Sequence, residues 1–287
     1  MRVALATCAA LPELTPDDRL LLAELRRRGT DCRPAVWDDD TVEWAAFDAV
    51  VVRSAWDYHL RAEAFLDWAS MVQAAAVTLW NPAALLRANA HKSYLRSLQA
   101  AGVPVLPTRW VDRGARVDLA ALLDEETWPE VVLKPAVSAS AHRTVRLTRA
   151  EAEGPAGRQA LQDLLATGDV LVQPYAAEIG EQGEWSFVFL GARYSHAVLK
   201  RPAAGDYRVQ EEWGGSAVAL PPPIGLLEQA RRIADRIPPP WLYARVDGID
   251  RAGTLVLMEL ELIEPHLFLA EDPQAPGRLA DAVLAAR

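Results

Sequence analysis

Hydrophobic and polar residues alternate along the first 85 residues in short blocks that predict strands and helices in turn. Residues 3–6 form an apolar run typical of a buried strand, and residues 15–18 carry the capping and acidic residues that start a helix. Leucines within residues 20–25 supply the apolar face of that helix, and Gly29 ends it. The pattern continues with strands expected at residues 33–37 and 49–53 and a helix at residues 62–75.

Beyond this region the pattern predicts more strand than helix. A helix expected at residues 89–101 ends at Gly102, before a strand at residues 105–111. Polar helices are expected at residues 151–167 and 226–236, and proline triplets flank the second of them. The other expected strands cover residues 131–135, 144–147, 170–173, 185–190, 192–200, 243–249 and 254–262, of which the fourth and fifth form a hairpin across Gly191.

These blocks predict an α/β protein with three units. A chain of 287 residues exceeds one ordinary core, so several units that share a cleft are expected. We expect an N-terminal α/β unit at residues 1–85, a central unit at residues 86–172 and a C-terminal unit at residues 173–287.

Composition and charge exclude several classes of protein. The chain is 51% hydrophobic and 24% charged, as in soluble globular proteins, and contains no run of 18 apolar residues. Because 39 acidic residues outnumber 30 basic ones, giving a net charge of −9, nucleic-acid binding through phosphate neutralisation is not expected. The two cysteines, Cys8 and Cys32, predict neither a disulfide scaffold nor a zinc site. We therefore expect a cytoplasmic protein that contacts neither nucleic acid nor membrane.

Three acidic residues near the C-terminus form the first candidate site. Glu259 and Glu261 are two apart in a strand, so their carboxylates share one face, and Asp247 lies on the preceding strand. Three carboxylates that meet across two strands would offer the oxygen ligands that Mg²⁺ prefers. A solvated strand face with alternating charge accounts for the same spacing, and spacing alone leaves both interpretations open.

Cations and small residues form the second candidate site. Lys134 ends an apolar run, so its ammonium group needs an anionic partner, and the loop after it contains Ser138 and Ser140 among alanines. Small residues allow backbone N–H groups to approach a phosphate, although a plain turn would have the same composition. Four further cations lie near strand ends, namely Lys200, Arg201, Arg208 and Arg245, and together with the acidic set they favour a metal–phosphate site over scattered surface charges.

The order of these motifs resembles the ATP-grasp superfamily over about residues 1–270. The resemblance implies an N-terminal Rossmann-like domain followed by two ATP-grasp subdomains, with ATP in the cleft between them. Within the stretch Asn89-Ala90-His91-Lys92 and within Val132-Leu133-Lys134-Pro135, Lys92 and Lys134 are similar to the two lysines that contact ATP phosphates. The remaining similar positions are Ser138 and Ser140 in the phosphate loop, Gln173 and Tyr175 in the adenine hinge, Glu178 at the ribose, Glu184 at the start of the large subdomain, Arg208 in Asp206-Tyr207-Arg208-Val209-Gln210, and the metal positions Asp247, Glu259 and Glu261.

Two departures from the superfamily pattern stand out. The last metal position is commonly Asn and is Glu261 here, which makes the site more negative and is consistent with two Mg²⁺ ions. The phosphate loop is rich in Ser and Ala where many relatives use Gly.

Three stretches resemble the D-cycloserine synthetases, which are O-ureido-D-serine cyclo-ligases. They are Arg53-Ser54-Ala55-Trp56-Asp57-Tyr58, Ser195-His196-Ala197-Val198-Leu199-Lys200 and Glu261-Leu262-Ile263-Glu264-Pro265. This resemblance implies an amino-acid-like substrate whose carboxylate is activated by ATP and attacked by a nitrogen of the same molecule. In that reaction Arg208 and Lys200 would stabilise the phosphoryl group, Arg53 and Arg245 would hold the substrate carboxylate, and His196 or Tyr58 would bind the amine end.

Two alternatives to cyclisation remain. One is a ligase that joins the activated carboxylate to a separate amine, as in peptide formation. The other is a protein that binds nucleotide without catalysis, which the full set of Lys92, Lys134, Arg208, Asp247 and Glu259 disfavours. A homodimer is expected only because such dimers are common among soluble enzymes.

Overall fold

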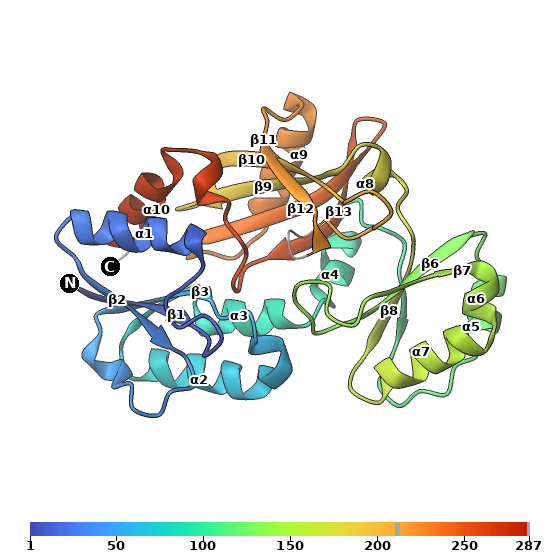
Figure 1. Cartoon of the computed structure of the whole chain (residues 1–287), viewed down its shortest axis with the longest axis horizontal. Coiled ribbons are helices and arrows are strands. Elements are labelled where there is room, and N and C mark those ends of the chain that lie inside the picture. The colour runs from blue at the N-terminus through green and yellow to red at the C-terminus, as the bar shows by residue number, and fades with distance from the viewer. Residues whose placement is uncertain (210–212, 286–287) are drawn as a thin grey trace.

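The computed structural model describes residues 1–209 and 213–285, and its strands form three separate sheets. Figure 1 shows the N-terminal sheet and the central sheet at opposite ends of the molecule, with the C-terminal sheet between and above them. Both chain ends lie at the N-terminal side. No helix among the described residues is long and apolar enough to cross a membrane.

The N-terminal sheet is parallel, with strand order β2-β1-β3-β4, as an α/β layer requires. Its alternating residues face opposite layers: Val3 and Leu5 pack with helix α1, whereas Ala4 and Ala6 pack with helix α2. Its elements are β1 (Arg2–Thr7), α1 (Pro16–Arg27), β2 (Asp31–Val36), β3 (Ala49–Ser54), α2 (Ala62–Ala74), β4 (Thr78–Trp80) and α3 (Ala83–Ala90).

The central sheet is antiparallel, in the order β5-β8-β6-β7, and is covered on one side only. Val131, Leu133 and Val172 face the three helices that cover it, whereas Val132 and Lys134 face the opposite side. Its elements are β5 (Arg109–Val111), α5 (Leu119–Asp124), β6 (Glu130–Pro135), β7 (Val145–Thr148), α6 (Arg149–Glu153), α7 (Pro155–Leu165) and β8 (Val170–Pro174).

The C-terminal sheet is antiparallel, with strand order β11-β10-β9-β12-β13. One face packs on helix α9 and on helix α4, which precedes the central sheet in the chain. The other face packs on the N-terminal unit and on helix α10. The elements are α4 (Tyr94–Ala100), α8 (Glu178–Glu181), β9 (Glu184–Leu190), β10 (Arg193–Arg201), β11 (Ser216–Ala219), α9 (Ile224–Ala234), β12 (Tyr243–Arg251), β13 (Thr254–Glu261) and α10 (Ala275–Ala285).

The structure corrects three predicted elements. The helix expected at residues 89–101 is interrupted, because His91 is extended and the Lys92 N–H donates to the Ala136 carbonyl 2.8 Å away. The helix expected at residues 151–167 is two helices, since Pro155 forces the preceding Gly154 out of the helical region. The strand expected at residues 105–111 is reduced to β5, and Val105 makes an isolated bridge to Leu257 of the C-terminal sheet. Strand β4 and helix α10 were not predicted by the pattern.

Candidate active site

A cavity of about 450 Å³ opens where the three sheets meet. The N-terminal unit contributes Trp56 and Tyr58 from the loop after β3, and the central sheet contributes Val132 and Lys134 from its uncovered face. Glu259 and its neighbours on β13 line the third side. Residues that are far apart in the chain therefore line one cavity.

Strand alternation explains why the C-terminal sheet is polar where it meets this cavity. Ser186 on β9, Lys200 on β10 and Arg245 and Asp247 on β12 lie on the same face as the apolar residues that contact the N-terminal unit. Towards the cavity that face changes from apolar to charged, and all four polar side chains are buried. Buried charges require partners, so a network of ion pairs is expected here.

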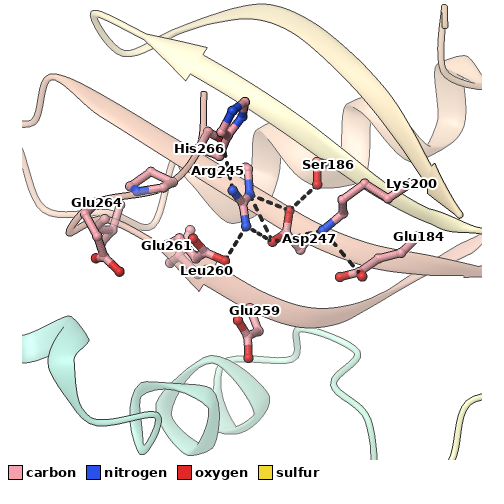
Figure 2. A network of polar contacts seen from close by, with 12 residues as sticks. Glu184, Ser186, Lys200, Arg245, Asp247, Glu259, Leu260, Glu261, Glu264 and His266 are labelled. Atoms are coloured by element: carbon pink, nitrogen blue, oxygen red, sulfur yellow. Dashed lines mark hydrogen bonds and ion pairs between the residues drawn. The ribbon is translucent and has the colours of Figure 1, made fainter. Parts of the chain in front are cut away.

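Figure 2 shows that network centred on Asp247. The Arg245 guanidinium donates to both oxygens of Asp247, with Nε–Oδ1 at 3.0 Å and Nη2–Oδ2 at 2.9 Å, and also donates to Glu261. The Lys200 Nζ atom lies 3.6 Å from Asp247 and 3.4 Å from Glu184. The Ser186 hydroxyl donates to Asp247 at 2.5 Å. Asp247 therefore orients Arg245 and Lys200 at the cavity wall.

A second group of charges surrounds Glu259. The Nζ atoms of Lys92 and Lys134 each lie 3.7 Å from its carboxylate. Lys92 also donates to the backbone carbonyl of Ser138 at 2.9 Å and to its hydroxyl at 3.2 Å. The break between α3 and α4 thus places Lys92 between the phosphate loop predicted from the sequence and the carboxylates of β13.

Burial and charge act in opposite directions on the pKa values of these groups. Burial alone would raise the pKa of Asp247, but Arg245 and Lys200 outweigh it and lower that pKa to about 2. Burial likewise opposes ionisation of Glu259, yet Lys92 and Lys134 lower its pKa. Burial lowers the pKa of Lys134, and Glu259 partly offsets that effect. Burial raises the pKa of Glu261 despite Arg245, and the neighbouring carboxylates of Asp247 and Glu259 add to the rise.

The carboxylates fit a divalent cation only in part. No three His, Cys, Asp or Glu side chains within residues 1–209 and 213–285 group as a metal site. Asp247 is 2% exposed and both of its oxygens accept hydrogen bonds, from Arg245 and Ser186, so metal binding there would require these contacts to loosen, and its role as the third ligand stays a prediction. Glu259 and Glu261 do fit, since their side chains are 28% and 27% exposed and the excess negative charge at Glu261 would be relieved by Mg²⁺.

The loop between β6 and β7 curves over one side of the cavity. Ser138, Ser140 and Ala141 all line it, and Ser140 and Ala141 have positive φ angles of 48° and 54°. Left-handed backbone at residues other than glycine is uncommon, and a loop that contains it can present successive N–H groups to an anion. The positions of Ser138 and Ser140 agree with the phosphate-loop interpretation.

Gln173 and Tyr175 also line the cavity, beyond the phosphate loop. The Gln173 amide donates to the Thr108 hydroxyl at 2.8 Å, and the Arg146 guanidinium lies 3.6 Å from the centroid of the Tyr175 ring. Both side chains are thereby fixed along the wall formed by β8.

Arg208 lines the cavity from the segment after β10. Its guanidinium donates to Asp206 at 2.8 Å and lies 3.4 Å from the centroid of the Trp213 ring. Gln210, the last residue of the motif that contains Arg208, lies outside the described residues.

Three predicted site residues lie away from the cavity. Arg53 is completely buried, with its Nε atom 2.8 Å from Asp18 and its Nη2 atom 2.6 Å from the Pro265 carbonyl. His196 is buried beside the Leu267 carbonyl, 3.0 Å from its Nε2 atom. Neither lines the cavity, so the prediction that they contact substrate is corrected: both hold the backbone of one segment. Glu178 begins α8 and pairs with Arg251 at 2.7 Å, outside the cavity lining, which corrects its predicted ribose role.

Four polar residues that line the cavity, among others, were not predicted as site residues: Tyr94, Tyr207, Glu264 and His266. Tyr207 and Glu264 belong to recognised stretches, whereas Tyr94 and His266 follow shortly after such stretches. Tyr94 accepts the Leu260 N–H at 3.2 Å, and the Tyr207 hydroxyl donates to the Thr144 carbonyl at 3.0 Å. For Glu264 the sequence did contain a signal of a site residue, because this second carboxylate follows Glu261 by three residues within a recognised stretch.

Comparison with solved structures identifies the class to which this fold belongs. A D-alanine–D-alanine ligase from Bacillus anthracis complexed with ATP has a TM-score of 0.71 at 14% identity, covering 100% of this chain and 97% of its own. A RimK-domain ATP-grasp protein from Sphaerobacter thermophilus has a TM-score of 0.72 at 20% identity, covering 99% of this chain and 100% of its own. The fold is that of the ATP-grasp proteins.

Closer relatives identify the family. The cycloserine biosynthesis protein DcsG of Streptomyces lavendulae is 32% identical over 302 aligned residues, which cover 98% of this chain and 97% of that protein. The crystal structure of D-cycloserine synthetase DcsG has a TM-score of 0.86 at 30% identity and covers 99% of both chains. The family model of the DcsG N-terminal domain matches residues 3–81. The chain belongs to the D-cycloserine synthetase family of ATP-grasp ligases and is an ATP-dependent ligase.

Proposed function

We propose that this ligase activates the carboxylate of O-ureido-D-serine with ATP and closes the ring of D-cycloserine. The observation that carries the proposal is one cavity in which five cationic side chains meet the carboxylates of β12 and β13. Such a cavity has room for phosphates at one end and a small amino acid at the other. The similarity to DcsG over nearly the whole chain supports the particular substrate.

The phosphate end of the cavity would be formed by the loop after β6. Lys92 and Lys134, on either side of Glu259, are the proposed ligands of the ATP phosphates, with Ser138 and Ser140 in the loop beside them. Gln173 and Tyr175 would lie beside the adenine base of ATP. The Glu184 carboxylate lies 3.4 Å from the Lys200 Nζ atom. Its proposed role is to position this lysine and not to contact the nucleotide directly.

The reaction would take place beside Arg245 and Lys200. A carboxylate oxygen of the substrate attacks the γ-phosphorus, ADP leaves, and an acyl phosphate results. A ureido nitrogen of the same molecule then attacks the activated carbonyl, phosphate leaves with the closure of a five-membered ring, and the carbamoyl group is lost to water. Arg245 would orient the carboxylate, Lys200 and Arg208 would stabilise the phosphoryl group, and Tyr58 would lie at the amine end. Holding both groups in one cavity supplies on the order of 7 to 11 kcal/mol of barrier reduction.

Glu259 and Glu261 would hold Mg²⁺, two ions in our proposal, close to the phosphates. Bound Mg²⁺ would neutralise the negative charge that develops on the phosphate oxygens during phosphoryl transfer. Arg245 would give up part of its contact with Glu261 and keep its contact with Asp247.

Three units would divide these tasks. In our proposal, residues 1–85 cover the substrate end, residues 86–172 carry the phosphate loop, and residues 173–287 supply the carboxylates. The enzyme would act on a small molecule, without nucleic acid or membrane, and a homodimer remains our expectation for its assembly.

Release of ADP and phosphate tests the reaction. With ATP and Mg²⁺, we expect release that depends on O-ureido-D-serine and a product with the mass of D-cycloserine. Release that requires a second, separate amine, with a product of higher mass, would replace cyclisation by intermolecular ligation. No stimulation by O-ureido-D-serine would contradict the proposed substrate.

Glu259→Gln tests the assignment of the metal ligands. We expect at least a 100-fold loss of ADP release with the fold intact, because loss of one preorganised charge at phosphoryl transfer costs about 3 to 4 kcal/mol. Glu271→Gln, at an exposed position outside the cavity lining, is the matched control. ADP release by Glu259→Gln at the rate of the control would refute the assignment, and circular dichroism would verify that both variants fold.

A further inference from the structure

The segment between β13 and α10 is held by an unusual series of side-chain donors. Six successive backbone carbonyls, those of residues 262–267, each lie within hydrogen-bond distance of a side-chain donor from another part of the chain, although the Tyr243 hydroxyl is shared with the Val52 and Trp80 carbonyls. In order along the segment, the donors are Asn81, Tyr243, Trp56, Arg53, Arg245 and His196, at distances between 2.6 and 3.3 Å.

These donors come from elements that fix the segment from several directions. Arg53 and Trp56 belong to the N-terminal unit, His196 to β10, and Tyr243 and Arg245 to β12. Each carbonyl has a donor within the chain itself, so the protein's own side chains fix this backbone. A fixed backbone gives its side chains defined positions and reduces the ordering cost of binding. The titratable side chains of residues 262–267, Glu264 and His266, line the cavity together with Ile263.

Glu264 differs in charge environment from the other acidic residues that line the cavity. Lysine or arginine nitrogens lie within 4 Å of the carboxylates of Glu184, Asp247, Glu259 and Glu261. No such nitrogen of the described residues lies within 4 Å of Glu264, although this residue is only 9% exposed. In Figure 2 no dashed line reaches the Glu264 carboxylate, which lies away from the network around Asp247. A carboxyl group buried in this way has no positive partner among the described residues to stabilise its ionised form.

We propose that Glu264 binds the α-ammonium group of the amino-acid substrate. The inference rests on the proposed function and deepens it, since it assigns the cationic end of the substrate to one side chain. A substrate with one carboxylate and one ammonium group then has a cation for the first, at Arg245, and an anion for the second, at Glu264. Arg245 contacts the segment that carries Glu264, because its Nη1 atom donates to the His266 carbonyl at 2.9 Å.

The titration of Glu264 is consistent with this role. Burial raises the pKa of its carboxyl to about 8, against weaker opposing effects of its own backbone N–H, Lys92, Arg245 and Arg53. Burial raises the pKa values of Tyr58, Tyr243 and Glu261, and the charge of Glu264 adds to the rise in all three. At pH 7 the free protein therefore holds a proton on Glu264, and an arriving ammonium group would displace it.

The deciding experiment removes the carboxylate of Glu264 from the protein and, separately, the amino group from the substrate. We would measure KM and kcat for ADP release with O-ureido-D-serine and with 3-(ureidooxy)propanoate, which lacks the amine, for wild type, Glu264→Gln and the control Glu271→Gln. We expect Glu264→Gln to raise KM for the amine substrate on the order of 100-fold, to leave KM for ATP unchanged, and to remove the preference for the amine. An equal fall of kcat with both substrates, at unchanged KM, would overturn the assignment.

A binding measurement separates this inference from the proposed reaction. D-Serine and 3-hydroxypropanoate would be titrated calorimetrically in the presence of ADP and Mg²⁺ at pH 7, in buffers of different ionisation enthalpy. We expect wild type to prefer D-serine and to release a proton on binding, and Glu264→Gln to lose both properties. This result supports the ammonium site even where O-ureido-D-serine fails as a substrate. Absence of any preference for D-serine by wild type, including absence of binding at millimolar concentration, would overturn it.

Discussion

A buried carboxylate without a cationic partner, such as that of Glu264, makes the folded protein sensitive to pH. Its pKa is about 8 in the folded protein, against an ordinary value of 4.5, so the folded state binds more protons than the unfolded state between these two pH values. Stability from this group is therefore fully present below pH 4.5 and is lost as pH rises towards 8. Sites kept for ligands commonly cost stability in this way.

We expect Glu264→Gln to remove this pH dependence. The loss in wild type between pH 4.5 and 7 is on the order of 3 kcal/mol, because one pKa unit corresponds to about 1.4 kcal/mol. The difference in Tm between the variant and wild type should thus increase in favour of the variant as pH rises from 5 to 8. Differential scanning calorimetry at four pH values would check it, and a Tm difference that stays constant would contradict the protonated state of Glu264.

Single residues also show how far motif recognition reaches. The motifs containing Arg53, His196 and Glu264 were correctly grouped, and they do meet in space, because two of them hold the backbone that carries the third. Their roles could not be predicted, since an arginine at a strand end has the same sequence signal whether it binds substrate or a carbonyl. Burial and partner atoms decide between these roles, and neither is encoded in spacing.

At the scale of elements, the strands were predicted better than the interruptions of helices and strands. Strands β1, β3, β6, β9 and β12 follow the apolar runs closely, because period-two alternation is a local property. The interruption between α3 and α4 depends on a backbone contact between Lys92 and Ala136, which are 44 positions apart. The bulge between Asp247 and Gly248 likewise depends on the pairing of β12 with β13.

At Gly183, immediately before β9, the packing of β9 against β10 requires a glycine. Its φ angle is +96°, and a Cβ atom there would lie 2.6 Å from the carbonyl oxygen of Lys200. Gly253, in the turn between β12 and β13, has a φ angle of +83° but no atom within 4 Å of such a Cβ.

We expect Gly183→Ala to cost more stability than Gly253→Ala and to impair catalysis. Gly253→Ala incurs only the left-handed backbone penalty, about 1 to 2 kcal/mol. Gly183→Ala adds a clash with β10 that displaces Lys200, so kcat for ADP release should also fall. Urea unfolding and initial rates for both variants check this prediction, and equal effects of the two would show that β10 tolerates the added methyl group.

At the scale of the whole molecule, one apolar core joins the two ends of the chain. Leu21 of α1, Val188 of β9 and Leu279 of α10 belong to the same buried cluster. The central sheet has a separate core with α5, α6 and α7, which includes Leu123. The molecule therefore consists of a body with a shared core and a central unit with its own core, and the cavity lies between them.

We expect Leu279→Ala and Leu123→Ala to destabilise different parts of the molecule. Both side chains are fully buried, and truncation of such a leucine costs about 2 to 5 kcal/mol. Leu279→Ala should increase hydrogen exchange in both α1 and β9, whereas Leu123→Ala should increase it only in the central unit. Mass spectrometry of exchanged peptides measures both responses. Protection of β9 that is unaffected by Leu279→Ala would contradict a shared core.

The sequence by itself determined the α/β class, most strands, the ATP-grasp resemblance and the two lysines that meet Glu259. These features follow from local periodicity and from motifs whose order is a property of the chain alone. Only the tertiary structure decided that Asp247 is paired with Arg245 and Lys200, that Arg53 and His196 hold a backbone segment, and that Glu264 has no cation beside it. The physical reason is that burial and the pairing of charges depend on residues brought together from three sheets, and no local pattern records their distances.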